Sequence, residues 1–334
     1  MRAIAASIGS IALVVWATLG VMGTTVLSAP DARAQGYIAG KPIKLVVGYP
    51  PGGSGDFTTR ILGDELSREL GQSVLIENRP GAGGLIAGDL VAKSAADGYT
   101  LLMAGHHAIL KSLFKKMPFD GERDFIPISQ IANGPMIVSV SANLPVKSLA
   151  ELIDYAKKNP GKLFNAASGS GSTPHLAFVQ FTAVAGIDIQ NVQYKGGAPS
   201  VQSVLAGDTQ MIIGTSPVVL PHIRSGKLRA LSLTTRAKSP ALPDIPSSEE
   251  AGLPGFDVGF WFGLYTPTGT PPVIVRRLHE AAAKILAKPE VRTRLASQGM
   301  DAAPSRSPED FAALIKREAP IWETVVRDSG ARAE

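Results

Sequence analysis

Short apolar runs alternate with helical repeats along most of this 334-residue chain. The run IKLVVG at 43–48 is rich in branched residues and predicts a buried strand. Asp56 is a good helix N-cap, leucines then recur at four-residue spacing, and Gly71 is typical of the position that ends a helix. A strand, a glycine-rich turn and a helix are therefore predicted between 43 and 71.

The same alternation continues beyond this first unit. Ser148 and Glu151 have the spacing of a capping box, which predicts that a helix starts at 149. Strands followed by helices in this way are typical of a parallel α/β sheet, so we predict the α/β class. Strands are expected at 73–77, 99–104, 163–167, 189–194, 209–214 and 228–235, and helices at 85–93, 149–159, 175–185, up to 206, up to 225, 272–287, 289–298 and 308–328.

Two extended segments, near 135–141 and 256–266, divide the pattern into two α/β modules. The second segment leads back to the first module, which predicts a discontinuous domain. We expect domain 1 to comprise 35–138 and 260–334, and domain 2 to comprise 139–259. Two domains joined by two crossings are typical of proteins that close around a ligand by a hinge motion.

The N-terminus has the pattern of an export signal. Arg2 precedes a long apolar run over 4–27, and the tripeptide ARA directly before Gln35 fits a small-x-small cleavage site. We therefore predict a cleaved signal peptide over 1–34 and a periplasmic mature chain. An uncleaved membrane anchor is the alternative, because the run is long enough for the roughly 20 residues that span a bilayer.

Composition narrows the function classes. The chain has no cysteine, which excludes disulfides, thiolate metal sites and cysteine nucleophiles. The net charge of +5 comes from scattered Lys and Arg residues rather than from runs, so we expect no nucleic-acid partner. The 45% hydrophobic content is that of a folded globular chain, and its length suffices for two domains.

The loops that follow predicted strands and precede predicted helices are polar or rich in glycine: PPGGSGD, GHHA, SGSGSTP, KGGAP and GTSP. In open α/β sheets, ligands bind at the carboxyl ends of the strands. Helix N-termini at those ends offer free N–H groups and the positive end of the helix dipole. These loops therefore favour an anion-binding site.

The stretch GYPPGGSGDF at 48–57 contains the richest of these loops. Two of its glycines have phosphate-loop spacing, but Ser54 stands where that motif needs lysine. The dinucleotide pattern fails as well, because Thr58 stands where its third glycine would be. Two interpretations remain: a carboxylate nest at a helix N-terminus, or an ordinary strand-to-helix turn capped by Asp56.

Motifs for catalysis are missing or isolated. The loop SGSGSTPH at 168–175 contains no G-x-S-x-G nucleophile elbow, and Ser172 and His175 have no evident acid partner. The loop predicts either a hydroxyl-rich ligand contact or a flexible loop in which Thr173 caps the next helix. The S-x-x-K match at 112–115 lies in a lysine-rich stretch without companion motifs, and we interpret it as chance.

Histidines and aromatic residues near the loops are candidates for ligand contact rather than for a metal site. His106 and His107 are adjacent, so on extended backbone their side chains point in opposite directions and would not share one metal. Contact of one with a ligand and a surface position remain open alternatives. Tyr194 lies beside a predicted loop, and Trp261 and Phe262 are expected in core or hinge packing, with a wall of the cleft as the alternative.

Eight motifs occur in order between Lys41 and the C-terminal helix: KPIKLVVGYPPGGSGD, GQSVLIENRPGAGG, DGYTLL, SGSGSTPHL, YKGGAP, LPHIRSGKLRAL, SPALPDIPSSEEAGLPGF and PEVRTRLASQG. Together they resemble the substrate-binding receptors of tripartite tricarboxylate transporters, the Bug family. The resemblance implies a type II-like, Venus-flytrap periplasmic binding protein with a hinged cleft between two α/β domains. Such a receptor captures a small organic carboxylate, aliphatic or aromatic, and delivers it to a membrane permease. It implies no enzyme activity, no cofactor and no metal, and we expect a monomer for a shuttle of this kind.

Carried onto this chain, the resemblance implies a carboxylate clamp in the 48–57 loop, faced by the loops at 168–173 and 195–198. Two stretches depart from the family's pattern, GHH at 105–107 and MIIGTS at 211–216. The first suits an anion or a polar ring, and the second lacks an acidic group, which argues against an amino-acid ligand. The candidate ligand-binding residues are Gly52, Gly53, Ser54, Asp56, His106, His107, Ser168, Gly169, Ser170, Ser172, Thr173, Tyr194, Gly197, Ala198, Thr215 and Ser216.

Two other function classes remain open beside a transport receptor. A periplasmic sensor component would present the same bound state to a sensor kinase instead of to a permease. A hydrolase that uses Ser172 is the third class, and it predicts turnover that a receptor would not show.

Overall fold

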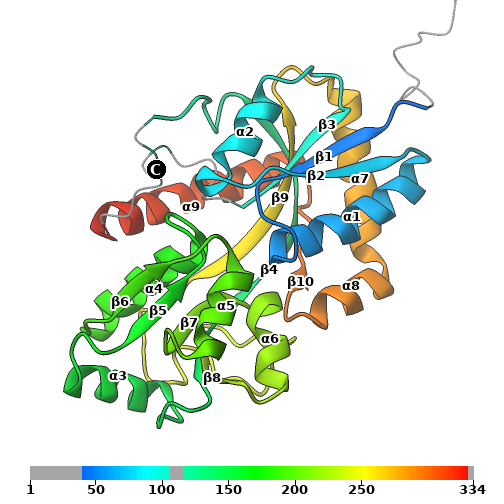
Figure 1. The fold of residues 1–334 in the computed structure, drawn as a ribbon. Coiled ribbons are helices and arrows are strands. Elements are labelled where there is room, and N and C mark those ends of the chain that lie inside the picture. The colour runs from blue at the N-terminus through cyan, green and yellow to red at the C-terminus, as the bar shows by residue number, and fades with distance from the viewer. Residues whose placement is uncertain (1–39, 106–110, 112–113, 115, 330–334) are drawn as a thin grey trace, which may run out of the picture. The chain divides into compact units, whose positions relative to one another are not determined.

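The computed structural model describes residues 40–105, 111, 114 and 116–329, which belong to one compact unit, Gly36–Glu334. Within these residues the strands form one mixed sheet in the order β2-β1-β3-β9-β4-β7-β5-β6, and β8 and β10 also pair with β4 (Figure 1). The predicted α/β class is confirmed. The strand order places the carboxyl ends of several strands beside one another, and the predicted loops follow those ends.

The N-terminal elements form one end of the sheet. Its three strands are parallel, and each of the first two leads into a helix. The elements are β1 (Ile43–Val47), α1 (Ser54–Leu70), β2 (Val74–Asn78), η1 (Ala82–Gly84), α2 (Leu85–Ala92) and β3 (Thr100–Ala104).

The other end of the sheet is built from the middle of the chain. Here β5 is parallel to both β6 and β7, and a helix follows each of these three strands. The elements are α3 (Leu149–Lys158), β5 (Phe164–Ala167), α4 (Thr173–Ala185), β6 (Gln190–Gln193), α5 (Gly197–Ala206), β7 (Met211–Thr215), α6 (Ser216–Arg224) and β8 (Leu228–Leu233).

Two antiparallel strands connect the ends. The long β4 (Phe125–Ser141) pairs with β9 (Gly259–Pro267) over its first part and with β7 and β8 over its second part (Figure 1). The predicted parallel sheet is found in part, at the two ends, and the centre is antiparallel because β9 returns between β3 and β4 and is antiparallel to both. The predicted domain boundaries fall at 138/139 and 259/260, within or beside these strands, and they stay a prediction.

The C-terminal elements return to the first end of the sheet. Helix α7 packs against α1 and β4, and β10 pairs with β4. No helix in the described ranges has the length and apolar content needed to cross a bilayer. The elements are α7 (Pro272–Ala287), α8 (Pro289–Ala296), β10 (Asp301–Ala302) and α9 (Pro308–Ser329).

The leucine spacing of α1 explains how its N-terminus is positioned. Leu62, Leu66 and Leu70 lie on its buried side, 1%, 0% and 8% exposed. Gly71 ends the helix at φ 65° in the left-handed region, as predicted. Truncating Leu66 to alanine would remove about 2–5 kcal/mol of stability, so this packing fixes the position of α1 as a whole.

Two of the predicted helix starts are wrong and one is confirmed. Helix α1 begins at Ser54 with Gly53 as N-cap, so Asp56 lies in the first turn rather than at the cap. Helix α4 begins at Thr173, and the cap is Ser172, whose Oγ accepts a hydrogen bond from the backbone N–H of His175. In both cases the chain enters the helix before the residue we expected. At α3 the predicted cap is observed, because Ser148 Oγ accepts from the N–H of Glu151.

Candidate functional site

Two adjoining cavities lie where the predicted loops meet. The smaller, here the helix-end cavity, has a volume of about 80 Å³ and is lined by the starts of α1, α4 and α5 and by aromatic residues of β9. The larger, here the turn cavity, has a volume of about 680 Å³ and is lined by the turns at 80–84, 168–172 and 193–196. Both cavities are lined by Tyr49, Pro50, Ser168, Ser172 and Gly196.

The helix-end cavity is surrounded by helix N-termini whose backbone donors have no side-chain cap. The N-caps of α1, α5 and α6 are Gly53, Gly196 and Thr215; all three line the cavity, and none accepts a hydrogen bond through its side chain. The first N–H groups of a helix have no partner within the helix. Each helix also places the positive end of its dipole there, which is worth about 0.3–1 kcal/mol to a nearby anion. The cavity is therefore suited to a negative group.

The charges of the lining side chains also favour an anion over a cation. Neither cavity has an Asp or Glu among its lining residues in the described part of the chain. Lys195 lines the turn cavity and is exposed. A carboxylate entering these cavities would thus meet backbone N–H groups and a lysine without repulsion from a neighbouring acid.

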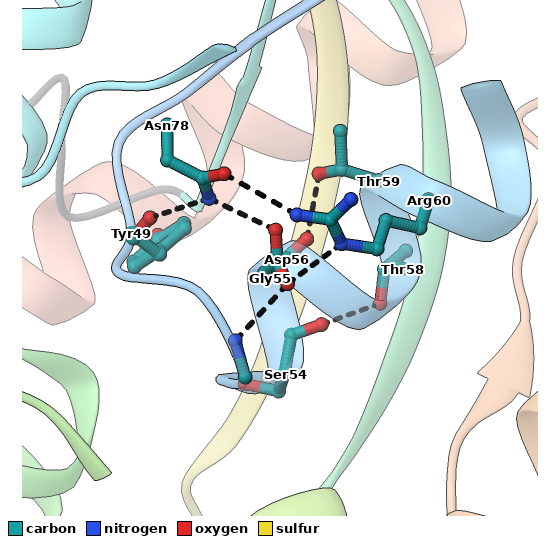
Figure 2. Close-up of polar contacts among 9 residues, drawn as sticks. Tyr49, Ser54, Gly55, Asp56, Thr58, Thr59, Arg60 and Asn78 are labelled. Atoms are coloured by element: carbon teal, nitrogen blue, oxygen red, sulfur yellow. Dashed lines mark hydrogen bonds and ion pairs between the residues drawn. The ribbon is translucent and has the colours of Figure 1, made fainter. Parts of the chain in front are cut away.

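Asp56 holds the first loop in place rather than lining either cavity (Figure 2). It is 4% exposed, and its Oδ2 accepts from the N–H of Gly52 at 3.0 Å and from Arg60 Nε at 2.9 Å. Its Oδ1 accepts from Asn78 Nδ2 at 2.9 Å, and the same amide donates to the carbonyl of Tyr49 at 3.0 Å. Burial opposes the charge on Asp56, but these hydrogen bonds outweigh it and lower its pKa. The ionised carboxylate therefore ties both ends of the 49–52 turn to α1 and β2.

Tyr49 forms a wall common to both cavities. Its hydroxyl accepts from the N–H of Gly105 at 2.9 Å, and its ring packs edge-on against Phe262 at 5.4 Å between centroids. Burial raises the pKa of Tyr49 far above its usual range, with a small opposing effect of the Gly105 hydrogen bond, so the hydroxyl stays neutral. A Cβ at Gly55 would lie 2.3 Å from Cδ2 of Tyr49, so only glycine at that position lets the ring pack on the start of α1.

The loop at 168–173 contributes hydroxyl groups to both cavities. Ser168, Ser172 and Thr173 line the helix-end cavity, and Gly169 and Ser170 line the turn cavity. These five candidates lie around the same two cavities as the first loop, because both loops follow the carboxyl ends of strands in one sheet. The loop faces that first loop across the cavities they share.

His175 supports this loop but has no geometry for activating Ser172. Its Nδ1 accepts from the N–H of Gly171 at 3.0 Å, and burial lowers the pKa of the ring, which keeps it neutral. The Ser172 hydroxyl is engaged by the backbone N–H of His175 rather than by its ring. The described contacts therefore form a helix cap and a loop brace instead of a nucleophile and base.

The remaining candidates divide between the cavities and their surroundings. Tyr194 lines the turn cavity and its hydroxyl is 2.5 Å from Ser203 Oγ, while Gly197 and Thr215 line the helix-end cavity. Ser216 lines neither cavity, because its Oγ donates to the carbonyl of Gly299 at 2.9 Å. Gly52 and Ala198 also lie outside both linings, and His106 and His107 fall outside the described residues.

Several lining residues were not among the predicted ones. Most of them lie within or next to the predicted loops or belong to the crossing strand β9. Trp261 and Phe262 line the helix-end cavity, which agrees with the alternative prediction that they form a wall of the cleft. Among the described residues, no group of three or more acidic or histidine side chains could hold a metal ion. The lining residues that were not named as candidates, some of them within the predicted loops at 48–57 and 195–198, are Gly48, Tyr49, Pro50, Gly55, Pro80, Gly81, Ala82, Gly83, Gly84, Pro174, Gln193, Lys195, Gly196, Val218 and Phe260.

Comparison with known proteins gives the family. The family model for the tripartite tricarboxylate transporter family receptor matches residues 58–331. Protein BugT of Bordetella pertussis is 36% identical over 319 residues, which cover 95% of this chain and 97% of BugT.

Solved structures show the same similarity. R. palustris Rpa4515 with adipate has a TM-score of 0.83 and 35% identity, covering 88% of this chain and 99% of that one. MatC (Rpa3494) from Rhodopseudomonas palustris with bound malate has a TM-score of 0.80 and 32% identity, covering 86% of this chain and all of that one, 100%. The matched family is one of transporter receptors rather than enzymes, so the prediction that this chain is not an enzyme is confirmed. The chain belongs to the tripartite tricarboxylate transporter receptor family, as its sequence motifs predict.

Proposed function

We propose that this protein is a periplasmic receptor that captures a small organic carboxylate in the helix-end and turn cavities and delivers it to a membrane permease. The observation that carries the proposal is the set of three helix N-termini without side-chain caps around one cavity, whose described lining residues include no acid. The structures of two similar proteins, one with adipate and one with bound malate, support the same chemical class of ligand.

The two cavities suit different parts of such a ligand. At about 80 Å³, the helix-end cavity has room for a single carboxylate among the N–H groups. The turn cavity, at about 680 Å³, would hold the body of the ligand against Tyr49, Pro50 and Tyr194. Lys195 lies on that side, so a second carboxylate at the far end of the ligand is favoured over a neutral end.

Capture is proposed to involve closure of the two predicted domains. Two contacts join residues of the predicted domain 1 to residues of domain 2. Gly196 lies so close to Pro50 that an added Cβ would be only 2.8 Å from Cγ of Pro50. Ser216 Oγ donates a hydrogen bond to the carbonyl of Gly299 at 2.9 Å. Contacts between the two predicted domains are what a closed receptor needs in order to exclude water and present one surface to a permease.

The location and processing of the chain form part of the proposal. Removal of residues 1–34 at the ARA site would release the compact unit into the periplasm.

The test is a binding screen of the chain from Gln35 onward by thermal shift and calorimetry. Adipate, malate, citrate and benzoate are compared with glutamate and glucose. A ligand at 100 times its Kd should add about 2.7 kcal/mol of stability, so we expect a clear shift with at least one carboxylate and none with glucose. Binding of glucose alone would overturn the carboxylate assignment, binding of glutamate alone would overturn the expectation against an amino-acid ligand, and copurification with the permease subunits would test delivery.

A further inference from the structure

A third cavity lies beside the crossing strands and is separate in its chemistry from the two described above. It has a volume of about 490 Å³ and is lined by residues of β4, β9 and α9 and by the segment at 235–240. We call it the acidic cavity. Phe260 and Trp261 belong to both its lining and that of the helix-end cavity.

The walls of the acidic cavity are aromatic and apolar. Phe260 and Trp261 come from β9, and Trp322 and Ile321 come from α9. Trp261 is held in place, because its Nε1 donates to Glu318 Oε2 at 2.8 Å and its ring packs edge-on against Phe311. Ile321 is 60% exposed at the surface although it is large and apolar. Such walls would bury the hydrocarbon part of a ligand.

The charges of the lining are mainly negative. Asp257, Asp301 and Glu318 contribute three carboxylates, whereas Lys238 is the one Lys or Arg among the described lining residues. Lys238 Nζ is paired with Glu250 at 2.9 Å, which partly neutralises it. Burial raises the pKa of Asp301. The cavity therefore favours a positive group and repels an anion.

Two buried oxygen atoms of the lining residues have no hydrogen-bond partner in the described part of the chain. Ser239 lines the cavity, is 5% exposed, and its Oγ has no hydrogen-bond partner within the described part of the chain. The same holds for Oε1 of Gln180, another lining residue. Buried polar atoms are rarely left unpaired, because each such atom loses its hydrogen bonds to water. A ligand that donates hydrogen bonds or carries positive charge would compensate for them.

We propose that the acidic cavity binds a small organic cation with an apolar body, such as an alkylammonium or quaternary ammonium ion. The aromatic rings attract the cation through their faces, and the carboxylates add attraction in a partly desolvated place. The four observations converge on this class: aromatic walls, an excess of carboxylates, buried acceptors and room for several carbon atoms. The proposal does not depend on the carboxylate-receptor function, since it rests on a different cavity.

Intrinsic fluorescence tests the proposal directly. The chain has three tryptophans, and one of them precedes residue 35, so the chain from Gln35 onward contains only Trp261 and Trp322. Both line the acidic cavity. The probe is choline, compared with 3,3-dimethylbutan-1-ol, which has the same shape and no charge. We expect saturable quenching by choline and binding about tenfold weaker or more for the alcohol.

Charge-neutralising variants provide the second measurement. The triple variant Asp257→Asn, Asp301→Asn, Glu318→Gln keeps shape and hydrogen-bond acceptors, and we expect it to bind choline at least about tenfold more weakly. Its matched control removes three exposed carboxylates elsewhere and leaves choline binding unchanged. If the triple variant melts early, the single Asp301→Asn replaces it. The control substitutions are Asp154→Asn, Asp188→Asn and Asp208→Asn.

Three results would overturn the proposal. They are no fluorescence change with choline at millimolar concentration, equal binding of choline and the alcohol, and equal loss in the triple variant and its control. Adipate added first separates this proposal from the receptor function. Quenching by choline that persists whether or not adipate binds supports the acidic cavity as a site of its own, and choline competing with adipate for one site contradicts it.

Discussion

The helix-end cavity and the acidic cavity touch the same two residues of β9, Phe260 and Trp261, yet they have opposite electrostatic character. In the helix-end cavity the preference for anions comes from the backbone, through N–H groups and dipoles at helix starts. In the acidic cavity the preference for cations comes from side chains, three carboxylates beside aromatic rings. Two cavities that share residues of one strand can therefore differ in the charge they favour, because in one the charge comes from the backbone and in the other from side chains.

The largest expected effect comes from placing a carboxylate in the helix-end cavity. Thr215→Asp would cap α6 well, so folding should be kept. A like charge about 4 Å from the ligand costs about 4 kcal/mol at an intermediate dielectric, so we expect carboxylate binding to weaken by a factor of about 100 or more. Calorimetry with the best ligand of the screen measures it. Thr215→Asn has the same shape and cap without the charge and should bind within a few fold of wild type, and equal losses in both would mean that charge is not the cause.

The next effect concerns the brace behind the first loop. Asp56→Ala leaves the donors of Gly52, Asn78 and Arg60 without their acceptor. We expect the free energy of unfolding to fall by about 2–4 kcal/mol and carboxylate binding to weaken about tenfold or more. Urea denaturation and calorimetry give the two values, and choline quenching at the acidic cavity should remain.

Asp64 lies on the same helix, is exposed, and provides the matched control. Asp64→Ala should change the free energy of unfolding by less than about 0.5 kcal/mol. If Asp56→Ala behaves like this control in both measurements, the brace has no part in positioning the loop.

The two regions also predict opposite dependences of stability on pH. Burial lowers the pKa of His175 below its ordinary value of 6.5, so the unfolded chain takes up more protons there. Its contribution is complete above pH 6.5 and is lost as pH falls through the lower pKa of the folded state. Burial raises the pKa of Asp301, so its contribution grows as pH falls through that raised pKa.

Denaturation at a series of pH values checks both signs. His175→Asn, which keeps an acceptor for the N–H of Gly171, should flatten the decline just below pH 6.5. His222→Asn on α6 should leave that decline in place. Asp301→Asn should remove the gain in stability that Asp301 contributes at lower pH. If His175→Asn or Asp301→Asn changed the pH dependence of stability in the opposite direction, the burial of the replaced group would be contradicted.

The smallest expected effect concerns the rim of the acidic cavity. Lys238→Met removes the lysine found among the described lining residues, and its ion pair with Glu250 is exposed, so stability should change little. Choline binding should strengthen about twofold, measured by tryptophan quenching. Lys162→Met, which removes an exposed lysine away from the cavity, should have no effect. Weaker choline binding in Lys238→Met would argue against a cation site.

Local pattern was sufficient for most elements of the fold and for part of the site. The leucine spacing of α1, the left-handed Gly71 and the cap at Ser148 depend on hydrogen bonds and packing within a few residues. The loops after the strands brought Gly53, Ser54 and the 168–173 segment together, because parallel strands end at one edge of a sheet. Tyr49 was not named as a candidate, because one aromatic residue beside a proline pair carries no periodic signal.

What the sequence by itself determined is the α/β class, the order of strands and helices, and, through its ordered motifs, the family. Tertiary structure alone decided the rest. It placed β9 antiparallel between β3 and β4, turned Asp56 from a helix cap into a buried brace, and assembled the acidic cavity from β4, β9 and α9. The physical reason is range: caps and periodicity are hydrogen-bonding and packing choices within one or two turns, whereas a brace or a cavity is defined by segments that meet only after the whole chain has folded.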